Sequence, residues 1–462
     1  MGGEHTPMKH VWLFPIWLGS MLFLYQHISP LLNLNFGIRI SPDRLLFLLI
    51  LGLFLKNTSG QRHGGTIERL MLGFAILCVL SWFVTGADSE NAKLRWLNTI
   101  FQLACFPFLA YYIASNSPYS EHDLKRLLNG VMVIQSYLVF TGLAAHYQIS
   151  WLVWPKYILD TTFSDQGDRL TGPFANSSML GAALVMNLGC LCIITLYSKG
   201  SKRLYLYVLI LLSCACIYFT STRTVWLGLF AMLLIFYLSR SGLRKPARTM
   251  GIGVLAIALT GVGSKFSLYQ KSLFSRRQET VEYRHINLQA GLKAFPEHPL
   301  FGTGYGGFAK LMSQNAGGLN INEKTLSSGN ENTWLGILVD LGLIGLVLYV
   351  MIFILFIRSN IRFLRRYDGE EPFARPLAVL ALAMVVYLVI NWSTGDLRFH
   401  LYDPCFAFLV QGIVVGLAKR VPEGRESASG KDLDHVAERV MDPDDGALAQ
   451  VTHFGRFSGG PA

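Results

Sequence analysis

Apolar runs long enough to cross a bilayer recur along almost the whole chain. A transmembrane helix needs about 20 mostly apolar residues, and hydropathy windows of that kind predict about twelve spans. The predicted spans are residues 11–27, 40–56, 69–86, 95–114, 125–146, 174–197, 203–220, 223–239, 248–264, 333–357, 375–393 and 399–418. The runs are continuous, whereas strands of a membrane barrel alternate over about ten residues. The pattern therefore predicts an all-α polytopic membrane protein.

Basic residues in the short loops predict the orientation of the chain, because cytoplasmic loops carry an excess of Lys and Arg. The loops on one side of the predicted helices contain more Lys and Arg than those on the other side. These residues are Lys56, Arg62, Arg69, Lys125, Arg126, Lys199, Lys202, Arg203, Arg240, Arg244, Lys245, Arg248, Arg358, Arg362, Arg365, Arg366, Arg375, Lys419 and Arg420. On the other side only segment 265–332 is also rich in Lys and Arg. The excess of basic residues marks the cytoplasmic side in short loops and not in long ones, so this segment does not change the orientation. We therefore expect both termini in the cytoplasm and residues 265–332 to form one large periplasmic loop with short helices.

Composition narrows the function classes. The chain is 52% hydrophobic and 15% charged, whereas soluble domains carry about 25% charged residues. The net charge of +11 comes from basic residues scattered beside the spans and not from a stripe, so we expect no nucleic-acid partner. Residues 419–462 are polar and rich in Gly, Ser, Asp and Pro. They predict a disordered cytoplasmic tail behind a transmembrane domain of residues 1–418.

The seven cysteines all fall within predicted spans. Two C-x-C pairs, at residues 190/192 and 214/216, are spaced so that their members do not share a helix face. The cysteines are therefore interpreted as packing residues. Neither a metal site nor a disulfide is expected. The segments on the predicted outer side contain few acidic residues and no D-x-D motif or histidine cluster with the spacing of metal ligands.

Polar residues collect at four places on the predicted outer side, and the first two each carry an arginine. In "GDRLTGPFANSSMLGAAL", residues 167–184, Arg169 stands just before a span. A structural role at the membrane interface explains Arg169 as well as a functional role does. In "FTSTRTVWLGLF", residues 219–230, four polar residues separate two apolar runs, so Arg223 must lie at the membrane boundary. The cost of arginine at membrane depth favours a functional role over a side chain that only reaches to the interface.

The third place is "SRRQETVEYRHINLQAGLKAFPEHPLFGTGYGGF", residues 275–308. Its first half has the apolar spacing of a helix, contains Arg277 and Arg284, and ends at two prolines. The following "GTGYGG", which includes Tyr305, is typical of a loop that approaches another group closely. Such a loop can cradle phosphate, although this one follows no strand. A helix lying on the bilayer surface is the alternative interpretation.

The fourth place is "SSGNENTWLGILVDLGLIGL", residues 327–346. Glu331 and Asn332 stand at the start of a predicted span, and Asp340 lies about 13 Å deeper along a helix. Asn332 or Asn330 can cap this helix. A carboxylate near a helix N-terminus is favoured by the dipole, so Glu331 also has a purely structural explanation. Asp340 needs a neighbouring arginine, a backbone group or a water-filled cavity as its partner.

Taken in order over roughly residues 160–400, these stretches resemble the O-antigen ligase and Wzy-type O-antigen polymerase superfamily. "RLTGPFANSSMLG" is similar to its R-x-x-G-x-F-x-N-x-x-x-x-G motif, and "STRTVWLGL" to its S-x-R segment at a span start. "YRHINLQAGLKAFPEHPLFGTGYGGF" resembles an arginine before a helix followed by P-L-F-G-x-G. "ENTWLGILVDLGLIGL" resembles H-N-x-x-L-x-x-L-x-E-x-G-x-x-G, with Glu331 in place of the histidine. Each motif is loose alone, but four in order are specific.

The resemblance implies a glycosyltransferase of the GT-C type in the bacterial inner membrane, with its active site facing the periplasm. Members of the superfamily take a polyprenyl-diphosphate-linked glycan as donor and transfer it, with inversion and without metal or other cofactor, to an acceptor hydroxyl. The acceptor is another lipid-linked glycan in polymerases and the lipid A core in ligases. Membrane lipids and the flippase and chain-length assembly machinery are the other expected partners.

Roles for the candidate residues follow from that chemistry. Glu331 is the expected general base, because a positioned carboxylate can deprotonate a hydroxyl. Arg223 and Arg284 are expected to hold the departing diphosphate, since a guanidinium matches phosphate oxygens in a bidentate manner. The substrate-binding candidates that support them are Arg169, Arg277, Asn332, Tyr305 and Asp340, the last as a residue behind the site.

Glu331 in place of histidine favours polymerisation of O-antigen or exopolysaccharide repeat units. The alternative is a ligase that attaches the polymer to the lipid A core. A polysaccharide or lipid transporter is less favoured, because its charges should lie near the bilayer midplane, often with inverted repeats. A structural membrane protein would not require arginines and a carboxylate on one side. The sugar, the linkage and the chain length have no signature in the sequence.

Overall fold

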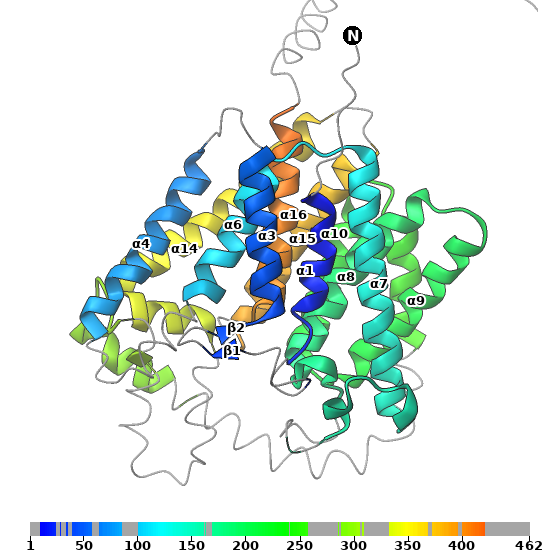
Figure 1. Ribbon diagram of the computed structural model, residues 1–462, viewed down its shortest axis with the longest axis horizontal. Coiled ribbons are helices and arrows are strands. Elements are labelled where there is room, and N and C mark those ends of the chain that lie inside the picture. The colour runs from blue at the N-terminus through cyan, green and yellow to red at the C-terminus, as the bar shows by residue number, and fades with distance from the viewer. Residues whose placement is uncertain are drawn as a thin grey trace, which may run out of the picture. The chain divides into compact units, whose positions relative to one another are not determined.

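The computed structural model describes residues 10–24, 28, 34–35, 39–57, 64–85, 100–160, 162, 169–239, 241–256, 285, 288–304, 307–308, 332–367, 372–395 and 400–420. The chain divides into two compact units, Met1–Ala418 and Lys419–Ala462. Only Lys419 and Arg420 of the second unit are described, so the predicted disordered tail lies outside the described residues. The described part of the first unit consists mainly of long helices (Figure 1).

The main helices are α1 (Phe14–Ser20), α3 (Pro42–Asn57), α4 (Thr66–Thr85), α6 (Phe106–Ser115), α7 (Glu121–His146), α8 (Ser177–Tyr197), α9 (Gly200–Phe219), α10 (Arg223–Leu238), α14 (Thr333–Arg366), α15 (Ala374–Trp392) and α16 (Tyr402–Ala418). Short turns are η1 (Val11–Leu13), the π-helical η3 (Phe101–Cys105), η4 (Ser150–Leu152), η5 (Lys156–Leu159), η6 (Gly172–Phe174) and η7 (Phe295–Glu297). Residues 244–256 are also helical. One small hairpin pairs β1 (Leu34–Asn35) with β2 (Arg39–Ile40) in antiparallel register.

Five described helices are long and apolar enough to cross a membrane: α7, α8, α9, α14 and α15. Shorter apolar helices cover residues 11–20, 102–115, 223–238 and 402–418. Described helical residues fall within each of the predicted windows, and the all-helical polytopic membrane protein is confirmed. The larger number of about twelve complete spans stays a prediction.

Helix α8 lies at the centre of the first unit, because its sequence is apolar on every side. It packs against α7, α9, α10, α15 and α16. Small residues allow these close approaches, as is common between membrane helices. A Cβ atom added at Gly189 of α8 would lie 2.3 Å from Leu380 of α15. One added at Gly228 of α10 would lie 2.3 Å from the ring of Tyr387 on α15.

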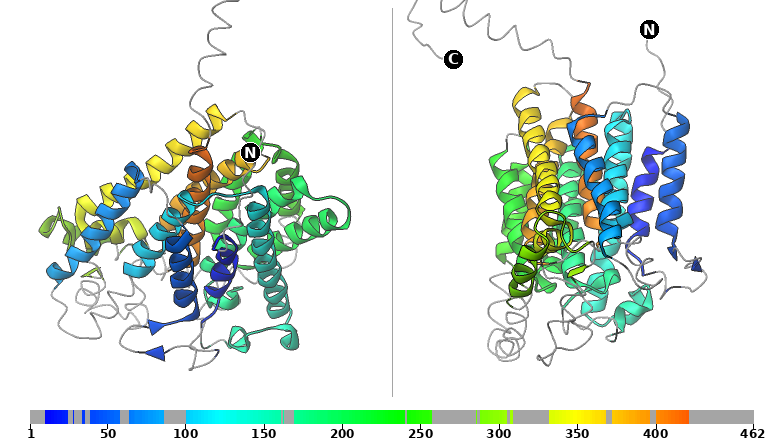
Figure 2. Two further views of the ribbon diagram at one scale, coloured as in Figure 1. Left: turned by 45° about the horizontal axis from the view of Figure 1, so that its top comes forward. Right: turned by 90° about the vertical axis from the view of Figure 1, so that its left-hand side faces the viewer.

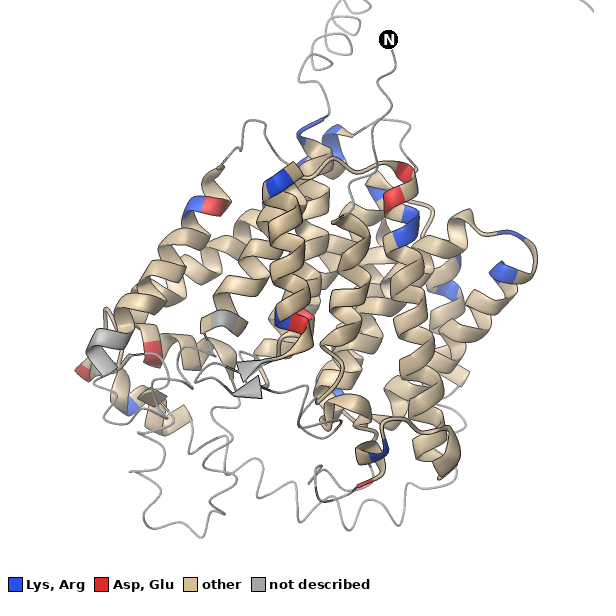
Figure 3. Ribbon diagram, in the orientation of Figure 1, with Lys and Arg blue, Asp and Glu red and all other residues tan. Residues whose placement is uncertain are grey.

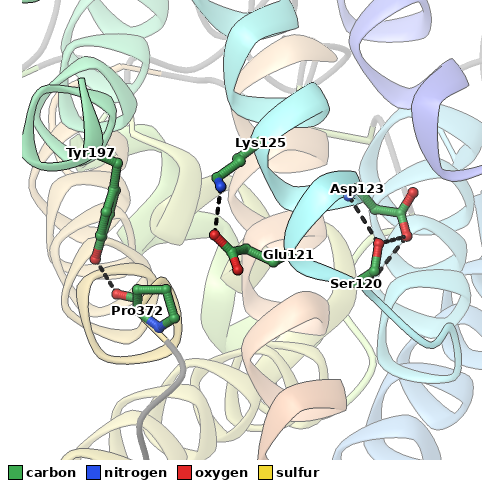
Figure 4. Close-up of polar contacts among 6 residues, drawn as sticks. All are labelled: Ser120, Glu121, Asp123, Lys125, Tyr197 and Pro372. Carbon is green, nitrogen blue, oxygen red and sulfur yellow. Dashed lines mark hydrogen bonds and ion pairs between the residues drawn. The ribbon is translucent and has the colours of Figure 1, made fainter. Parts of the chain in front are cut away.

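Lys and Arg gather toward one end of the helices, the upper end in Figure 3. We call it the basic end. The start of α7 lies there and is closed by a capping box, in which Ser120 Oγ accepts from Asp123 N and Ser120 N donates to the Asp123 carboxylate (Figure 4). Glu121 pairs with Lys125 at 2.5 Å, and Tyr197 donates to the carbonyl of Pro372 just before α15 (Figure 4). The capping box closes the basic end of α7, and the Tyr197 contact joins the basic end of α8 to the residues just before α15.

Candidate active site

Helix α14 is broken inside the motif "VDLGLIG". Gly342 has φ 68° and ψ −171°, a left-handed, non-helical conformation that glycine adopts without steric cost. In a straight helix, residues 334 and 349 would lie about 22 Å apart along the axis. The ring centroids of Trp334 and Tyr349 are instead 6.3 Å apart. The short first part of α14 therefore folds back on the long second part, and the two parts can be followed in Figure 2.

A break in a helix leaves carbonyls and N–H groups without partners, and the loop segment 299–303, "PLFGT", supplies them. Val339 O accepts from Thr303 N at 2.9 Å and from Thr303 Oγ1 at 3.2 Å. Beyond the break, Leu343 N donates to Pro299 O at 2.9 Å and Ile344 N donates to Leu300 O at 3.3 Å. The P-L-F-G motif is thus seated in the gap of α14. We call this arrangement the seated loop.

Two glycines make the seated loop possible. Gly302, with φ +71°, lies so close to α14 that an added Cβ would be 2.5 Å from the carbonyl of Asp340. A Cβ on Gly342 would lie 2.2 Å from Leu300 O. At Gly302, therefore, the close approach predicted for the Gly-rich stretch is an approach to the protein's own backbone. Tyr305 lies outside the described residues, so its predicted contact with substrate stays a prediction.

Asp340 stands beside the break and is fully buried. Its Oδ1 accepts the backbone N–H of Phe308 at 2.9 Å, so the carboxylate is tied to the chain five residues beyond the seated loop. Of the partners expected for Asp340, the structure shows a backbone group. This geometry favours a supporting position behind the site, and any contact of Asp340 with substrate stays a prediction.

The start of α14 is fixed by two hydrogen-bonding residues. Asn332 Oδ1 accepts from Trp334 N at 2.9 Å and Leu335 N at 3.2 Å, which confirms the capping expected of this residue. Thr333 Oγ1 donates to Gly395 O at 2.9 Å and joins α14 to the segment after α15. Glu331 directly precedes this capped turn and lies outside the described residues, as do Arg277 and Arg284.

Arg223 is the first residue of α10 and is exposed. The turn before it is as tight as the sequence predicted: Thr220 N still bonds to Cys216 O of α9, and Ser221 has φ 51°. A cation at a helix N-terminus opposes the helix dipole. The helix alone therefore gives no reason for an arginine at this position, and a bound anion would supply one.

The segment that contains Arg169 adjoins this turn. Arg169 is exposed, and the next residue, Leu170, donates its N–H to Phe219 O at 3.1 Å. Ser177 Oγ, at the start of α8, lies 3.2 Å from Thr222 Oγ1. The first two arginine motifs, which are separated by about fifty residues of chain, are thus side by side.

A row of polar contacts continues from these motifs to α14. Thr224 Oγ1 donates to Asn391 Oδ1 at 3.4 Å, near the end of α15. Four residues further, Gly395 receives the hydrogen bond from Thr333. We call the row Ser177, Thr222, Thr224, Asn391, Gly395 and Thr333 the polar rim. It places the Arg223 turn and the start of α14 at the same end of the helices.

Two polar residues of this region were not singled out from the sequence. Asn391 is buried at the end of α15. A polar amide inside the apolar run 375–393 was the feature of the sequence that could have identified it. Asp403, in the first turn of α16, is buried, and neither carboxylate oxygen has a hydrogen-bond partner among the described residues. Groups of three or more metal-ligating side chains are absent from the described part of the chain.

Comparison with known proteins assigns this region to a family. Residues 206–350 match the family model described as O-antigen ligase. Over these residues, about a third of the chain, the protein is similar to the O-antigen ligase family. The match extends from α9 through the Arg223 turn and the seated loop to the broken part of α14, and leaves Arg169 and Asn391 outside. No curated protein matches the chain.

The match confirms the resemblance drawn from the motifs and the prediction of a glycosyltransferase-type enzyme. The family implies O-antigen ligase-type or polymerase-type glycan transfer with lipid-linked glycan substrates. The individual roles assigned to Arg169, Arg223, Arg277, Arg284 and Glu331 stay predictions.

We expect Gly342→Ala to unseat the loop. Alanine would have to adopt a backbone conformation that is essentially restricted to glycine, at a cost of about 1–3 kcal/mol, and its Cβ would collide with Leu300 O. Thermal unfolding of the purified protein in detergent should shift down by several degrees, and the loop around residue 300 should become sensitive to protease. Gly251→Ala is the matched control, because an added Cβ there meets nothing within 4 Å. Equal melting temperatures for the two variants would contradict the seated loop.

Proposed function

We propose that this chain polymerises lipid-linked glycan repeat units at the periplasmic face of the bacterial inner membrane. The donor is a polyprenyl-diphosphate-linked glycan, and the acceptor is a hydroxyl on another lipid-linked glycan. The observation that supports this most is the exposed Arg223 at the start of α10. Arg223 and the start of α14 both lie within the matched residues 206–350, and the polar rim connects them through the end of α15. The proposed architecture is of the GT-C type with about twelve spans.

The proposed reaction is a single displacement with inversion. The Glu331 carboxylate takes the proton of the acceptor hydroxyl, and the oxygen attacks the anomeric carbon of the donor. The bond from that carbon to the diphosphate oxygen breaks, and polyprenyl diphosphate leaves with the electron pair. Arg223 and Arg284 stabilise the growing negative charge, with Arg169 and Arg277 beside them, so that neither a metal nor another cofactor is needed.

The distribution of basic residues supports the orientation. Lys and Arg gather at the end where α7 and α15 begin and α14 ends (Figure 3), and cytoplasmic loops carry an excess of these residues. We assign the basic end to the cytoplasm, together with both termini. The polar rim then faces the periplasm, where flipped lipid-linked glycans are exposed and where flippase and chain-length proteins are the proposed partners.

A ligase that transfers finished polymer to the lipid A core is the second candidate, since the family match does not separate the two. Deleting the gene and profiling the glycans distinguishes them. If the chain is the polymerase, single repeat units should cap the acceptor in the deletion strain. Full-length polymer stranded on the polyprenyl carrier would contradict polymerisation and identify a ligase.

Arg223→Ala should lower turnover by about 10²–10³-fold, the usual effect of removing one donor that stabilises transition-state charge. Arg223→Lys should recover only part of the rate, because an ammonium lacks the bidentate fork. The measurement is product formation per folded protein with purified donor. Arg203→Ala, an exposed arginine at the other end of α9, is the matched control and should keep the wild-type rate. A wild-type rate for Arg223→Ala would remove this residue from the mechanism.

Glu331→Gln should lower the rate by about 10²–10⁴-fold, the contribution of a positioned base, and leave donor binding nearly unchanged. Glu331→His should restore part of the rate, and that rate should rise with pH through about 6.5, the ordinary pKa of an imidazole. Glu297→Gln, an exposed carboxylate in η7, is the control. If Glu331 only complements the dipole of α14, the Gln variant should lose about 0.3–1 kcal/mol of stability and transfer normally.

A further inference from the structure

An unusual concentration of exposed apolar side chains follows the end of α7. In residues 147–154, "YQISWLVW", Trp151 is 78% exposed, Trp154 is 56% exposed and Leu152 is 50% exposed. We call this segment the aromatic loop. It continues the chain beyond the lower end of α7 in Figure 1. Exposed apolar groups on the flank of a membrane helix face lipid, but this loop lies past the last turn of its helix and needs another explanation.

The aromatic loop is held firmly despite its exposure. Helix α7 ends in a Schellman motif: Ile149 N donates to Ala144 O at 2.8 Å and Gln148 N to Ala145 O at 3.2 Å, with Gln148 at φ 61°. Trp154 O accepts from Tyr137 Oη at 2.7 Å, and the Trp154 ring packs on Phe23 at 5.4 Å. The exposed rings are therefore presented by a fixed backbone.

The length of α7 indicates the depth of this loop in the membrane. Lys125 and Arg126 near the start of the helix are solvent-exposed charges that belong outside the hydrocarbon. From residue 127 to the end of α7 at His146 no Asp, Glu, Lys or Arg occurs. This stretch rises about 30 Å, the thickness of the hydrocarbon core. The aromatic loop then begins where the hydrocarbon ends, at the level of the lipid headgroups.

Tryptophan and tyrosine concentrate at that level, because an apolar ring that carries one polar N–H or O–H suits the boundary between acyl chains and water. We propose that the aromatic loop is an interfacial anchor whose partner is the headgroup and upper acyl region of the lipid leaflet on this side of the membrane. The proposal rests on exposure, fixation and depth, and not on the proposed transfer reaction.

The anchor is connected to the candidate active site. Tyr157, which follows the loop in η5, donates from its hydroxyl to Pro173 O at 2.7 Å and accepts from Leu24 N at 3.1 Å. Pro173 belongs to η6, between Arg169 and α8. A loop held at the lipid surface therefore also sets the height of the Arg169 segment relative to the headgroups. A lipid-linked diphosphate would lie at that same height.

The test measures how deeply the loop residues lie in a bilayer. The full-length protein is reconstituted in phosphatidylcholine vesicles brominated either near the glycerol end or near the methyl end of the acyl chains. Bromine quenches nearby tryptophan fluorescence. The chain has nine tryptophans, so the fluorescence of the loop is obtained as the difference between the wild type and the double variant Trp151→Phe, Trp154→Phe. Bromine near the glycerol end should quench this fluorescence strongly, and bromine near the methyl end should quench it weakly.

The buried Trp392 provides the matched control, since the signal lost in Trp392→Phe should respond little to either lipid. A loop signal quenched by aqueous iodide and by neither brominated lipid would overturn the proposal in favour of open solvent. A loop signal quenched by none of the three would overturn it in favour of a protein partner or a second copy of the chain. Circular dichroism and gel filtration check folding, and the corresponding Tyr variants replace any Phe variant that fails to fold.

Discussion

A backbone group without a hydrogen-bond partner is costly in a membrane protein, and the break of α14 at Gly342 creates several. The segment 299–303 removes that cost by forming hydrogen bonds on both sides of the break, to Val339 before Gly342 and to Leu343 and Ile344 after it. The same contacts tie residues 299–303 to both parts of α14. The seated loop therefore fixes how the first part of α14, with its capped start at Asn332, lies against the second part.

The polar rim adds a second constraint at the same end of the helices. Each of its hydrogen bonds joins elements that are distant in the sequence, from α8 to the α9–α10 turn, from α10 to α15 and from the end of α15 to α14. Between membrane helices such bonds contribute about 0.6 kcal/mol each on average. Their value here is geometric: the ends of four helices cannot shift independently, which suits a site whose parts come from several helices.

Features that depend on local sequence could be predicted from it. The helices, the cap at Asn332 and the tight turn before Arg223 each follow from a short window of residue types. The seated loop and the polar rim could not be predicted, because they pair segments whose contact depends on the tertiary fold. Gly302 shows the difference: the sequence indicated that its backbone must approach something closely, but only the fold shows that the neighbour is Asp340. Asn391 was overlooked for the same reason, since one amide in an apolar run has no visible partner.

The position of Arg223 connects these constraints to the proposed chemistry. A guanidinium in the first turn of α10 stands against the positive end of the helix dipole, and by itself this arrangement is unfavourable by about 0.3–1 kcal/mol. A diphosphate bound here would offset this repulsion, because the N–H groups at the start of the helix and the guanidinium would both attract the same anion. The tight turn, held to α8 by Ser177 and to α15 by Thr224, keeps the two positive contributions together. Charge that grows on the leaving group would thus meet a potential already in place, with little rearrangement needed during transfer.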